Sequence, residues 1–281
     1  MIEDNYKNIK TTWLEELNNE KEQLRKVQQE QKNTLDSIFY ARKIQDAILI
    51  GRGELENIFG DFAIVYEPKN IVSGDFYYAQ KKGNKKYLVV ADCTGHGVPG
   101  AFMSILCNDF LIRAMKTKSL PNEILNRVNE LLIKRLCVDE KNEITDGMDV
   151  GVAQIDYDAM KINYSGAMND GVLITANNEF TLLKSTRKSI GNCFRIKNFS
   201  SYELHTVDFK KGDILYLFSD GFKDQINKEG KKIGMKLFLN TLSEMYSIEL
   251  KKQQTLLTKM FNRFVADVDQ LDDVLVLGIR L

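Results

Sequence analysis

The residues of this sequence that are best suited to chemistry are aspartates that lie at or near the ends of short apolar segments. An apolar segment of about five residues predicts a buried strand, which holds a carboxylate at its end in a fixed place. Several such carboxylates suit hard divalent cations such as Mg²⁺ or Mn²⁺ rather than zinc, and the chain has only two histidines. The candidate ligands are Asp75, Asp92, Asp220 and the pair Asp272–Asp273.

Asp92 lies in the stretch around which the rest of the chain is organised. The apolar run Tyr87–Ala91 predicts a strand, and a helix is expected from about Val98. The glycines between and just after them let backbone groups approach closely, which is a common way to hold a cation. The alternative for Asp92, and equally for Asp220, is an Asx-type hydrogen bond that caps a turn. The alternative for Asp75 is a surface position on a strand.

Four motifs in this order resemble the metal-dependent serine/threonine protein phosphatases (PPM family), in particular their bacterial SpoIIE-like branch. The resemblance covers roughly residues 58–281, and each motif alone is weak while the ordered set is specific. The motifs are Ser73-Gly-Asp-Phe-Tyr77, Ala91-Asp-Cys-Thr-Gly-His-Gly97, Ser219-Asp-Gly221 and Asp272-Asp-Val274.

The resemblance implies two Mn²⁺ or Mg²⁺ ions that bind the substrate phosphate and activate a water molecule. Asp92 matches the carboxylate that bridges both ions and positions the nucleophilic water. The backbone carbonyl of Cys93 matches the neighbouring main-chain ligand, and Asp220 matches a ligand of the first ion.

The same resemblance implies two further acidic ligands. Asp272 matches the remaining ligand of the first ion, and Asp273 stays open as an additional or alternative ligand. Asp75 matches the acidic position that contacts the second ion, directly or through water.

Neither His96 nor Arg52 is assigned a catalytic role from the sequence. The better-known phosphatases of the family have a histidine directly after their Asp-Gly, whereas here Cys93, Thr94 and Gly95 come between Asp92 and His96. Such a histidine more often packs or hydrogen-bonds in the turn. Arg52 precedes the first strand, so phosphate binding is left to the metal ions and the backbone.

The composition predicts a cytoplasmic globular protein. Of 281 residues, 43% are hydrophobic, enough for a sizeable core. Lys plus Arg and Asp plus Glu both number 39, which removes the electrostatic basis for non-specific nucleic-acid binding. No apolar run approaches membrane-spanning length, and no signal-peptide core is present. The cysteines lack a C-x-x-C pair and fit reduced thiols; they are Cys93, Cys107, Cys137 and Cys193.

The N-terminal segment predicts a long helix from about Asn5 to Ile50, since it is rich in Glu, Gln, Lys and Leu without Pro or Gly. Its heptad seam is interrupted by polar residues, which indicates a weak or switchable coiled coil. The resemblance to the SpoIIE-like branch implies that such a helix is a regulatory and dimerising element, so a homodimer is expected. A single helix folded back on the domain is the alternative. We expect a regulatory helical segment at 1–53, a hinge at Gly51–Gly53 and a phosphatase domain at 54–281. The apolar seam residues are Tyr6, Trp13, Leu17, Leu24, Val27, Ile38, Ala41 and Ile48; the interruptions are Lys10, Glu20, Gln31, Thr34 and Gln45.

The remaining chain alternates groups of short strands with pairs of helices, which predicts an α+β fold. Early strands at Phe62–Tyr66, Ile71–Tyr78 and Tyr87–Ala91 indicate an antiparallel meander. The resemblance sharpens the fold to an αββα sandwich of two antiparallel sheets flanked by helices. Further elements are expected after a charged loop at Asp139–Asp146: strands at Met148–Asp156, Lys161–Ser165, Val172–Ala176, Phe180–Leu183, Tyr202–Val207, Ile214–Ser219 and Val274–Ile279, and helices at Met235–Tyr246 and Glu249–Val268.

Three functions remain open from the sequence. The first is a metal-dependent phosphatase for phosphoserine or phosphothreonine on a bacterial signalling protein, for which family analogy suggests an anti-sigma-factor antagonist. The second is a catalytically silent module of the same fold that binds partners. The third is a metal hydrolase for a small phosphoester.

Overall fold

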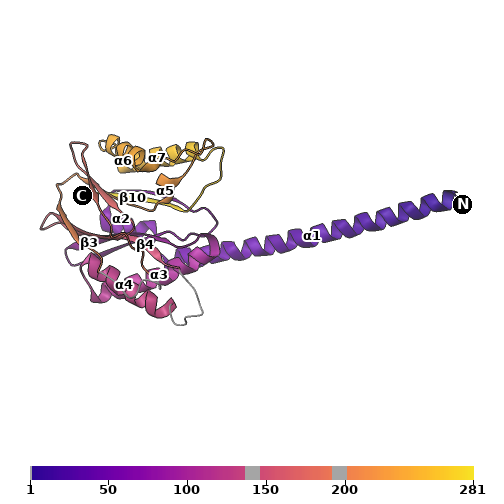
Figure 1. Ribbon diagram of the computed structural model, residues 1–281, viewed down its shortest axis with the longest axis horizontal. Coiled ribbons are helices and arrows are strands. Elements are labelled where there is room, and N and C mark those ends of the chain that lie inside the picture. The colour runs from indigo at the N-terminus through magenta and orange to yellow at the C-terminus, as the bar shows by residue number, and fades with distance from the viewer. Residues whose placement is uncertain (1, 137–145, 192–200) are drawn as a thin grey trace. The chain divides into compact units, whose positions relative to one another are not determined.

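The computed structural model describes residues 2–136, 146–191 and 201–281. It divides into two compact units, residues 1–43 and residues 44–281. The first unit is helical and belongs to α1 (Ile2–Ile48), a single continuous helix (Figure 1). The expected charged loop at Asp139–Asp146 lies outside the described residues except for Asp146. Cys137 and Cys193 also lie outside them.

The seam residues of α1 from Trp13 to Val27 are exposed in the single chain. Trp13 is 73% exposed and Leu24 is 58% exposed, and Leu17 and Val27 are also exposed. Large apolar side chains at heptad spacing on an isolated helix are typical of a coiled-coil seam.

The second unit is built from two stacked five-stranded antiparallel sheets. Sheet A has the strand order β1-β10-β9-β6-β7, and sheet B has the order β2-β3-β4-β5-β8. Sheet A contains β1 (Phe62–Glu67), β6 (Gly171–Ile174), β7 (Phe180–Leu183), β9 (Ile214–Phe218) and β10 (Val274–Arg280). Sheet B contains β2 (Phe76–Lys82), β3 (Lys85–Cys93), β4 (Met148–Asp156), β5 (Lys161–Ala167) and β8 (His205–Asp208).

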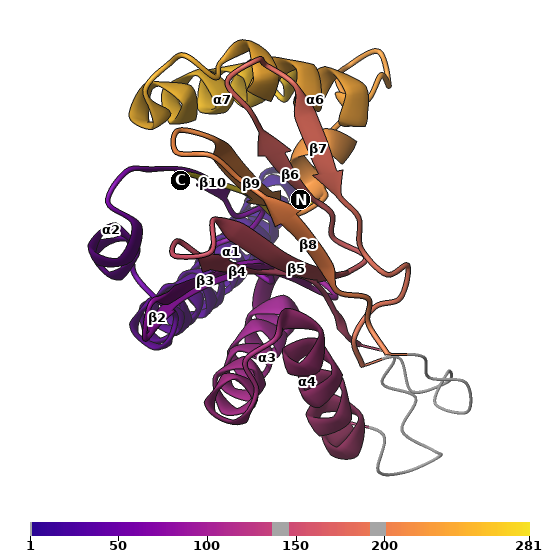
Figure 2. The same ribbon diagram turned by 90° about the vertical axis from the view of Figure 1, so that its left-hand side faces the viewer.

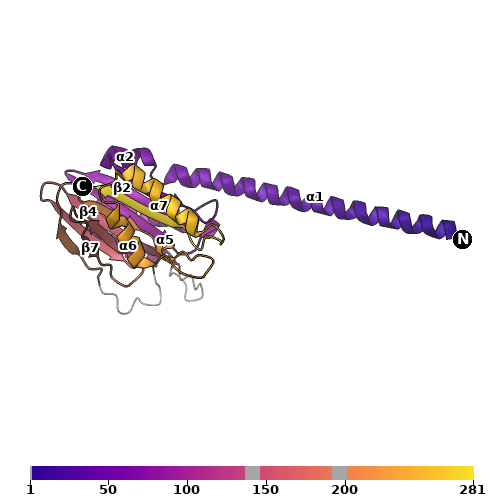
Figure 3. The same ribbon diagram turned by 90° about the horizontal axis from the view of Figure 1, so that it is seen from above.

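Helices cover the outer face of each sheet, so the unit has four layers (Figure 2). The pair α3 (Gly97–Thr117) and α4 (Pro121–Leu136) packs on sheet B. The helices α6 (Gly234–Glu244) and α7 (Leu250–Phe264) pack on sheet A, where Figure 3 shows them from above. The shorter helices are α2 (Arg52–Phe59) and α5 (Gly221–Asp224). The expected αββα sandwich is confirmed.

The strands alternate between the core that separates the sheets and the layers under the helices. In β3, Leu88 and Val90 contact the core between the sheets, whereas Val89 and Ala91 pack under the helices. Successive side chains of a strand point to opposite faces. A residue's place in the strand therefore decides whether it faces the space between the sheets.

Two expectations for the first strands are wrong. The strand expected at Ile71–Tyr78 begins only at Phe76, because the amides of residues 73–75 donate to side chains rather than to a neighbouring strand. The meander is also wrong, since β1 pairs with β10 in sheet A while β2 and β3 belong to sheet B.

The expected hinge at Gly51–Gly53 instead opens a helix that the sequence analysis missed. Gly51 has extended dihedral angles and caps α2, and Gly53 lies in its first turn. The compact unit also begins at Ile44, ten residues before the expected boundary at 54, so residues 44–53 pack with the sandwich.

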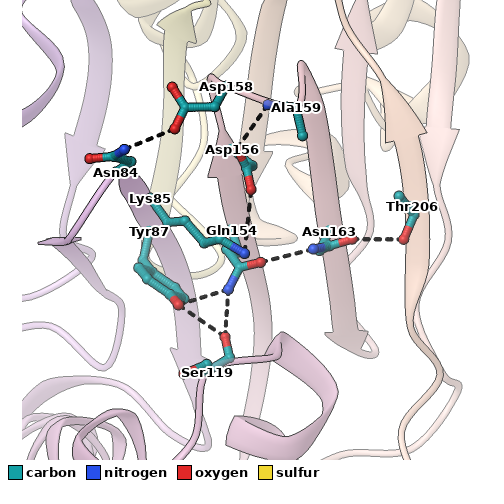
Figure 4. A network of polar contacts seen from close by, with 10 residues as sticks. All are labelled: Asn84, Lys85, Tyr87, Ser119, Gln154, Asp156, Asp158, Ala159, Asn163 and Thr206. Carbon is teal, nitrogen blue, oxygen red and sulfur yellow. Dashed lines mark hydrogen bonds and ion pairs between the residues drawn. The ribbon is translucent and has the colours of Figure 1, made fainter.

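A row of polar side chains crosses sheet B toward the ends of β3 and β4 that are opposite to Asp92 and Asp149 (Figure 4). The buried Gln154 donates to the Tyr87 hydroxyl and to the Ser119 carbonyl, both at 2.7 Å, and accepts from Asn163 at 2.8 Å. Thr206 then donates to Asn163 at 2.7 Å. Every polar atom of the buried Gln154 side chain is thereby satisfied.

Within the described residues, α3 alone passes a test of length and hydropathy for a membrane-spanning helix, although the sequence analysis found no such run. Just over half of its apolar window, 56%, is buried inside the protein. The core helix of a sandwich passes the same test, and packing under sheet B accounts for the apolar composition of α3.

Candidate functional site

Three aspartates form a row across one end of sheet B. Asp92 in β3 lies directly opposite Asp149 in β4. Asp75 is the residue just before β2, and the first residue pair of β2 with β3 is Phe76 with Ala91. This antiparallel register places Asp75 beside Asp92. The alternation of these strands directs all three side chains toward the space between the sheets.

Sheet A brings further aspartates to the same end of the sandwich. Asp220 follows β9, and the pair Asp272–Asp273 precedes β10, which runs antiparallel beside β9. A Cβ atom at Gly221 would come within 2.0 Å of the Asp273 main-chain oxygen. Only glycine therefore allows the turn after Asp220 to lie against the start of β10.

The carboxylates raise one another's pKa. Burial raises the pKa of Asp75 well above its usual value, and Asp273, Asp272 and Asp220 add to the increase, while the Ser219 hydroxyl opposes it. Burial also raises the pKa of Asp92 well above its usual value, with the negative charges of Asp75 and Asp220 as the next causes. These shifts show that the aspartates from both sheets share one electrostatic site.

Asp220 and Asp149 belong to this site as well. Burial raises the pKa of Asp220, and the nearby Lys223 partly offsets the shift. Burial raises the pKa of Asp149, an effect to which the charge of Asp220 contributes and which a hydrogen bond from Ser189 opposes.

Glycines let the loops of the site pack backbone against backbone. A Cβ atom at Gly74 would lie 2.6 Å from the Gly95 oxygen and 3.0 Å from the Cys93 oxygen. A Cβ atom at Gly100 would lie 2.2 Å from the Gly95 oxygen, and Gly95 itself has a φ of +84°. The Cys93 carbonyl, a candidate ligand from the sequence, thus lies against the loop that carries Asp75.

The two residues of the terminal acidic pair are placed differently. Asp273 is 3% exposed, and its two carboxylate oxygens accept hydrogen bonds of 2.7 Å from the amides of Lys69 and Gly74. Asp272 is exposed, and its Oδ1 accepts from the Asp273 amide at 2.8 Å. Asp273 therefore holds the loop before β2, whereas Asp272 keeps an oxygen without a hydrogen bond in the described structure.

The donor set suits a hard divalent cation. Asp75 Oδ2 is buried and has no hydrogen-bond partner among the described residues, an arrangement that costs free energy unless a cation or donor compensates it. The surrounding ligands are carboxylate and carbonyl oxygens, which Mg²⁺ and Mn²⁺ prefer. Among the described residues, no group of three or more acidic, cysteine or histidine side chains lies close enough together to hold a metal ion. The case for a cation therefore rests on the chemistry of the ligands and on the electrostatic interactions between the aspartates.

The histidines lie apart from this donor set. His96 contacts Asn70 and Lys69 through its ring nitrogens. His205 lies in β8, with its Nε2 3.6 Å from Glu203.

Sequence reasoning missed Asp149, Ser219 and Gln45 as parts of the site. Asp149 opens a strand in the same way that Asp92 closes one, so a correct pairing of β3 with β4 would have identified it. Gln45 was interpreted as an interruption of the helical seam, but it is 3% exposed and its amide contacts Ser73. No local sequence signal distinguishes it from the other interruptions.

Comparisons with known proteins agree with this architecture. The sequence model of the family described as Stage II sporulation protein E (SpoIIE) matches residues 82–281. The phosphoserine phosphatase RsbU of Bacillus subtilis is 25% identical over 215 residues, which are 75% of this chain. The chain spans 59% of the length of that relative.

Solved structures show the same fold. The SiaA-PP2C domain of Pseudomonas aeruginosa superposes with a TM-score of 0.81 and 27% identity, covering 89% of this chain and 98% of that one. The PP2C phosphatase domain of SpoIIE from Bacillus subtilis, solved with a fragment of its regulatory domain, gives a TM-score of 0.64 and 17% identity, covering 79% of this chain and 63% of that one.

Proposed function

The chain belongs to the SpoIIE family, and from that premise we propose that it is a metal-dependent protein phosphatase for phosphoserine or phosphothreonine. The observation that carries the proposal is the placement of aspartates from both sheets at the same end of the sandwich, in a family with phosphatase relatives. Its substrate is a phosphorylated signalling protein of the bacterial cytoplasm, and an anti-sigma-factor antagonist is the first candidate by analogy.

The proposed metal ligands are carboxylates and one main-chain carbonyl. Asp92 would be the ligand that helps to hold both Mn²⁺ or Mg²⁺ ions. The Cys93 carbonyl and Asp75 would hold them from the sheet B side, and Asp220 and Asp272 from the sheet A side. Asp273 is assigned to hold the loop before β2, because its oxygens already accept two amide hydrogen bonds.

The chain's own residues contribute orientation and charge. Bound divalent ions would neutralise the phosphate and lower the pKa of the attacking water. The aspartates hold a fixed set of negative charges at the site, and the glycine loops let main-chain oxygens approach it. The Ser219 hydroxyl partly offsets the raised pKa of Asp75, and the Tyr66 hydroxyl donates to the Asp75 main-chain oxygen at 3.0 Å.

The test is phosphate release from a phosphoserine protein with Mn²⁺, with Mg²⁺ and with EDTA. We expect metal-dependent release by the intact chain and a loss of more than about 100-fold in Asp92→Asn, since even partners of metal ligands contribute 10–100-fold. Asp208→Asn, an exposed aspartate of β8, is the matched control. Metal-independent release, or full activity of Asp92→Asn, would refute the proposal.

We further propose that the chain forms a homodimer through the exposed seam of α1. Leu17→Glu with Leu24→Glu should give a monomer in sedimentation, because buried glutamates at facing seam positions repel. Asn18→Glu with Arg25→Glu, one position further along the helix, should remain dimeric. A monomeric intact chain contradicts this proposal.

A further inference from the structure

Lys69 and His96 meet at the edge of the acidic site. The Lys69 Nζ lies 2.9 Å from the His96 Nε2, and the His96 Nδ1 lies 2.8 Å from the Asn70 Oδ1. His96 and Asn70 are exposed, and Lys69 is half-buried. The three side chains therefore form a short chain of contacts that is open to solvent.

The chemistry of the donors fixes the direction of these contacts. An ammonium group only donates hydrogen bonds, so the Nε2 of His96 accepts from Lys69. The proton of the ring is then on Nδ1, which donates to the amide oxygen of Asn70. The histidine is neutral in this arrangement, and it orients the lysine instead of presenting a proton at Nε2.

The position of Lys69 is fixed by the site itself. Its main-chain amide donates to one oxygen of the Asp273 carboxylate. The other oxygen accepts from the amide of Gly74, the residue before Asp75. His96 lies just after Gly95, whose main-chain oxygen packs against Gly74. Lys69 and His96 thus join the two loops that carry Asp75 and Asp92.

The Lys69 ammonium is not neutralised by the acidic residues around it. In the part of the chain that the structure describes, no carboxylate forms an ion pair with it, whereas Lys223 on the other side of the site pairs with Asp224 at 3.1 Å. An ammonium has three N–H donors, and the contact with His96 uses one. The other two have no partner among the described residues.

We propose that Lys69 binds the phosphate group of the substrate and that His96, held by Asn70, is its positioning residue. This inference rests on the proposed function and adds a protein cation that the sequence analysis did not find. A lysine is a common ligand for phosphate as a compact positive charge. Binding at this position makes Lys69 part of the recognition of the phosphoryl group, whatever protein carries it.

The test uses 4-nitrophenyl phosphate as substrate and inorganic phosphate as inhibitor, both with saturating Mn²⁺. Lys69→Met should raise KM and the inhibition constant of phosphate by about tenfold or more, with a smaller effect on kcat, because it removes binding to a group present before and during the reaction. Lys69→Arg should retain most of the affinity. Lys211→Met, an exposed lysine elsewhere on the unit, should behave as the wild type.

Two substitutions test whether His96 acts on Lys69 by accepting a hydrogen bond. His96→Leu should raise KM in the same way as Lys69→Met, and His96→Gln should restore part of the affinity because its amide oxygen can accept from Lys69. Calorimetric titration of inorganic phosphate into each Mn²⁺-loaded variant gives the same ranking without turnover. The Lys69 side chain does not make the bond to Asp273, so Lys69→Met should keep the wild-type melting temperature.

The outcomes separate this inference from the proposed function. Absence of any metal-dependent turnover by the wild type refutes the proposed function and this inference with it. Turnover with unchanged KM and phosphate inhibition in Lys69→Met overturns the inference alone. A raised KM for a phosphoprotein with unchanged values for 4-nitrophenyl phosphate and inorganic phosphate also overturns it, since Lys69 would then contact the protein part of the substrate.

Discussion

The side-chain amide of Gln45 donates a hydrogen bond of 2.7 Å to the main-chain oxygen of Ser73, and its carbonyl oxygen accepts one of 3.2 Å from the Ser73 amide. Gln45 also donates to the Ser104 hydroxyl at 2.9 Å. The last turns of α1 therefore bind the segment that leads into Asp75. This contact gives the helix a direct structural link to a candidate metal ligand.

Replacement of Gln45 by alanine should reduce metal-dependent turnover by roughly tenfold, as expected for residues that orient metal ligands. It leaves the buried Ser73 amide without its acceptor, whereas the Ser73 main-chain oxygen still accepts from the Ser104 hydroxyl at 3.3 Å. The unpaired amide should lower the free energy of unfolding by about 1–3 kcal/mol. Turnover at several Mn²⁺ concentrations and chemical denaturation measure the two effects. Gln31→Ala, an exposed interruption of the same seam, is the control, and equal behaviour of both variants would rule out the link.

Asp149 provides a test of the site that the sequence did not suggest. It faces Asp92 across β3 and β4, so Asp149→Asn removes a negative charge beside the proposed bridging ligand. We expect the Mn²⁺ concentration for half-maximal turnover to rise about tenfold, because cation affinity depends on the charge of the ligand set.

The matched control for this prediction lies at the other end of the same strand. Asp156 is the last residue of β4 and pairs with Lys85 at 3.3 Å. Asp156→Asn should leave the Mn²⁺ titration unchanged. A Mn²⁺ titration of Asp149→Asn that overlays the wild type would exclude Asp149 from the metal site.

The stability of the protein in EDTA should fall as the pH rises. The pKa of Asp75 is raised in the folded protein, chiefly by burial, whereas an unfolded aspartate has a pKa of about 3.9. Between these values the folded state binds more protons than the unfolded state, so the free energy of unfolding decreases with pH. The contribution of this group is complete below about pH 4 and is lost as the pH rises through the folded pKa.

Urea denaturation from about pH 4 to 8, in EDTA, measures this dependence. Asp75→Asn lacks the ionisable group and should show a flatter dependence than the wild type, while Asp208→Asn should not. Saturating Mn²⁺ should also flatten the wild-type curve, since a cation stabilises the ionised carboxylate. Parallel curves for the wild type and Asp75→Asn would contradict the raised pKa.

The sequence was sufficient to predict most elements of the fold because their periodicity is local. The helix expected from about Val98 is α3, and the strands expected at Met148–Asp156 and Lys161–Ser165 are β4 and β5. The pairing of β1 with β10 was missed because it joins segments more than 200 residues apart, with no local signal. The loop Ile71–Asp75 was mistaken for a strand because its amides bind side chains that are distant in the sequence, including Gln45 and Asp273.

Candidate site residues could be predicted where they belong to a sequence motif. They could not be predicted where only packing in the folded chain distinguishes them. Asp92 and Asp220 were predicted as ligands from their neighbours in the sequence, and the structure places both at the same end of the sandwich. Asp272 and Asp273 share one motif, and only burial and hydrogen bonds distinguish them. Lys69 lacks any motif, and its contact with His96 follows from the path of two loops.

Gln154 should contribute to stability without contributing to chemistry. Its amide joins Tyr87, Ser119 and Asn163 toward the ends of β3 and β4 that are opposite to Asp92 and Asp149 (Figure 4). Gln154→Leu keeps the volume but removes these three hydrogen bonds, although the Tyr87 hydroxyl still donates to the Ser119 carbonyl at 3.0 Å. Their loss should lower the free energy of unfolding by about 1–3 kcal/mol. Below the melting temperature, kcat and KM should match the wild type; a large loss of kcat in the folded variant would contradict the separation of the two regions.

The final prediction separates the two residues of the terminal acidic pair. Asp272→Asn should weaken Mn²⁺ binding by about tenfold or more, because it removes a charged ligand, and should leave the stability in EDTA nearly unchanged. Asp273→Asn replaces an acceptor of two amide hydrogen bonds by a group with one acceptor oxygen. It should lower the free energy of unfolding in EDTA by about 1–3 kcal/mol, the cost of a buried donor that loses its partner.

Calorimetric titration with Mn²⁺ and denaturation in EDTA distinguish these roles in the same pair of variants. Asp273→Ser offers a second variant that is too short to ligate, and it should resemble Asp273→Asn in stability. If Asp272→Asn retains full Mn²⁺ affinity while folded Asp273→Asn loses it, the assignment is reversed. Asp273 would then be the ligand, and its two amide bonds would orient a coordinated carboxylate, as hydrogen bonds from outer partners do at metal sites.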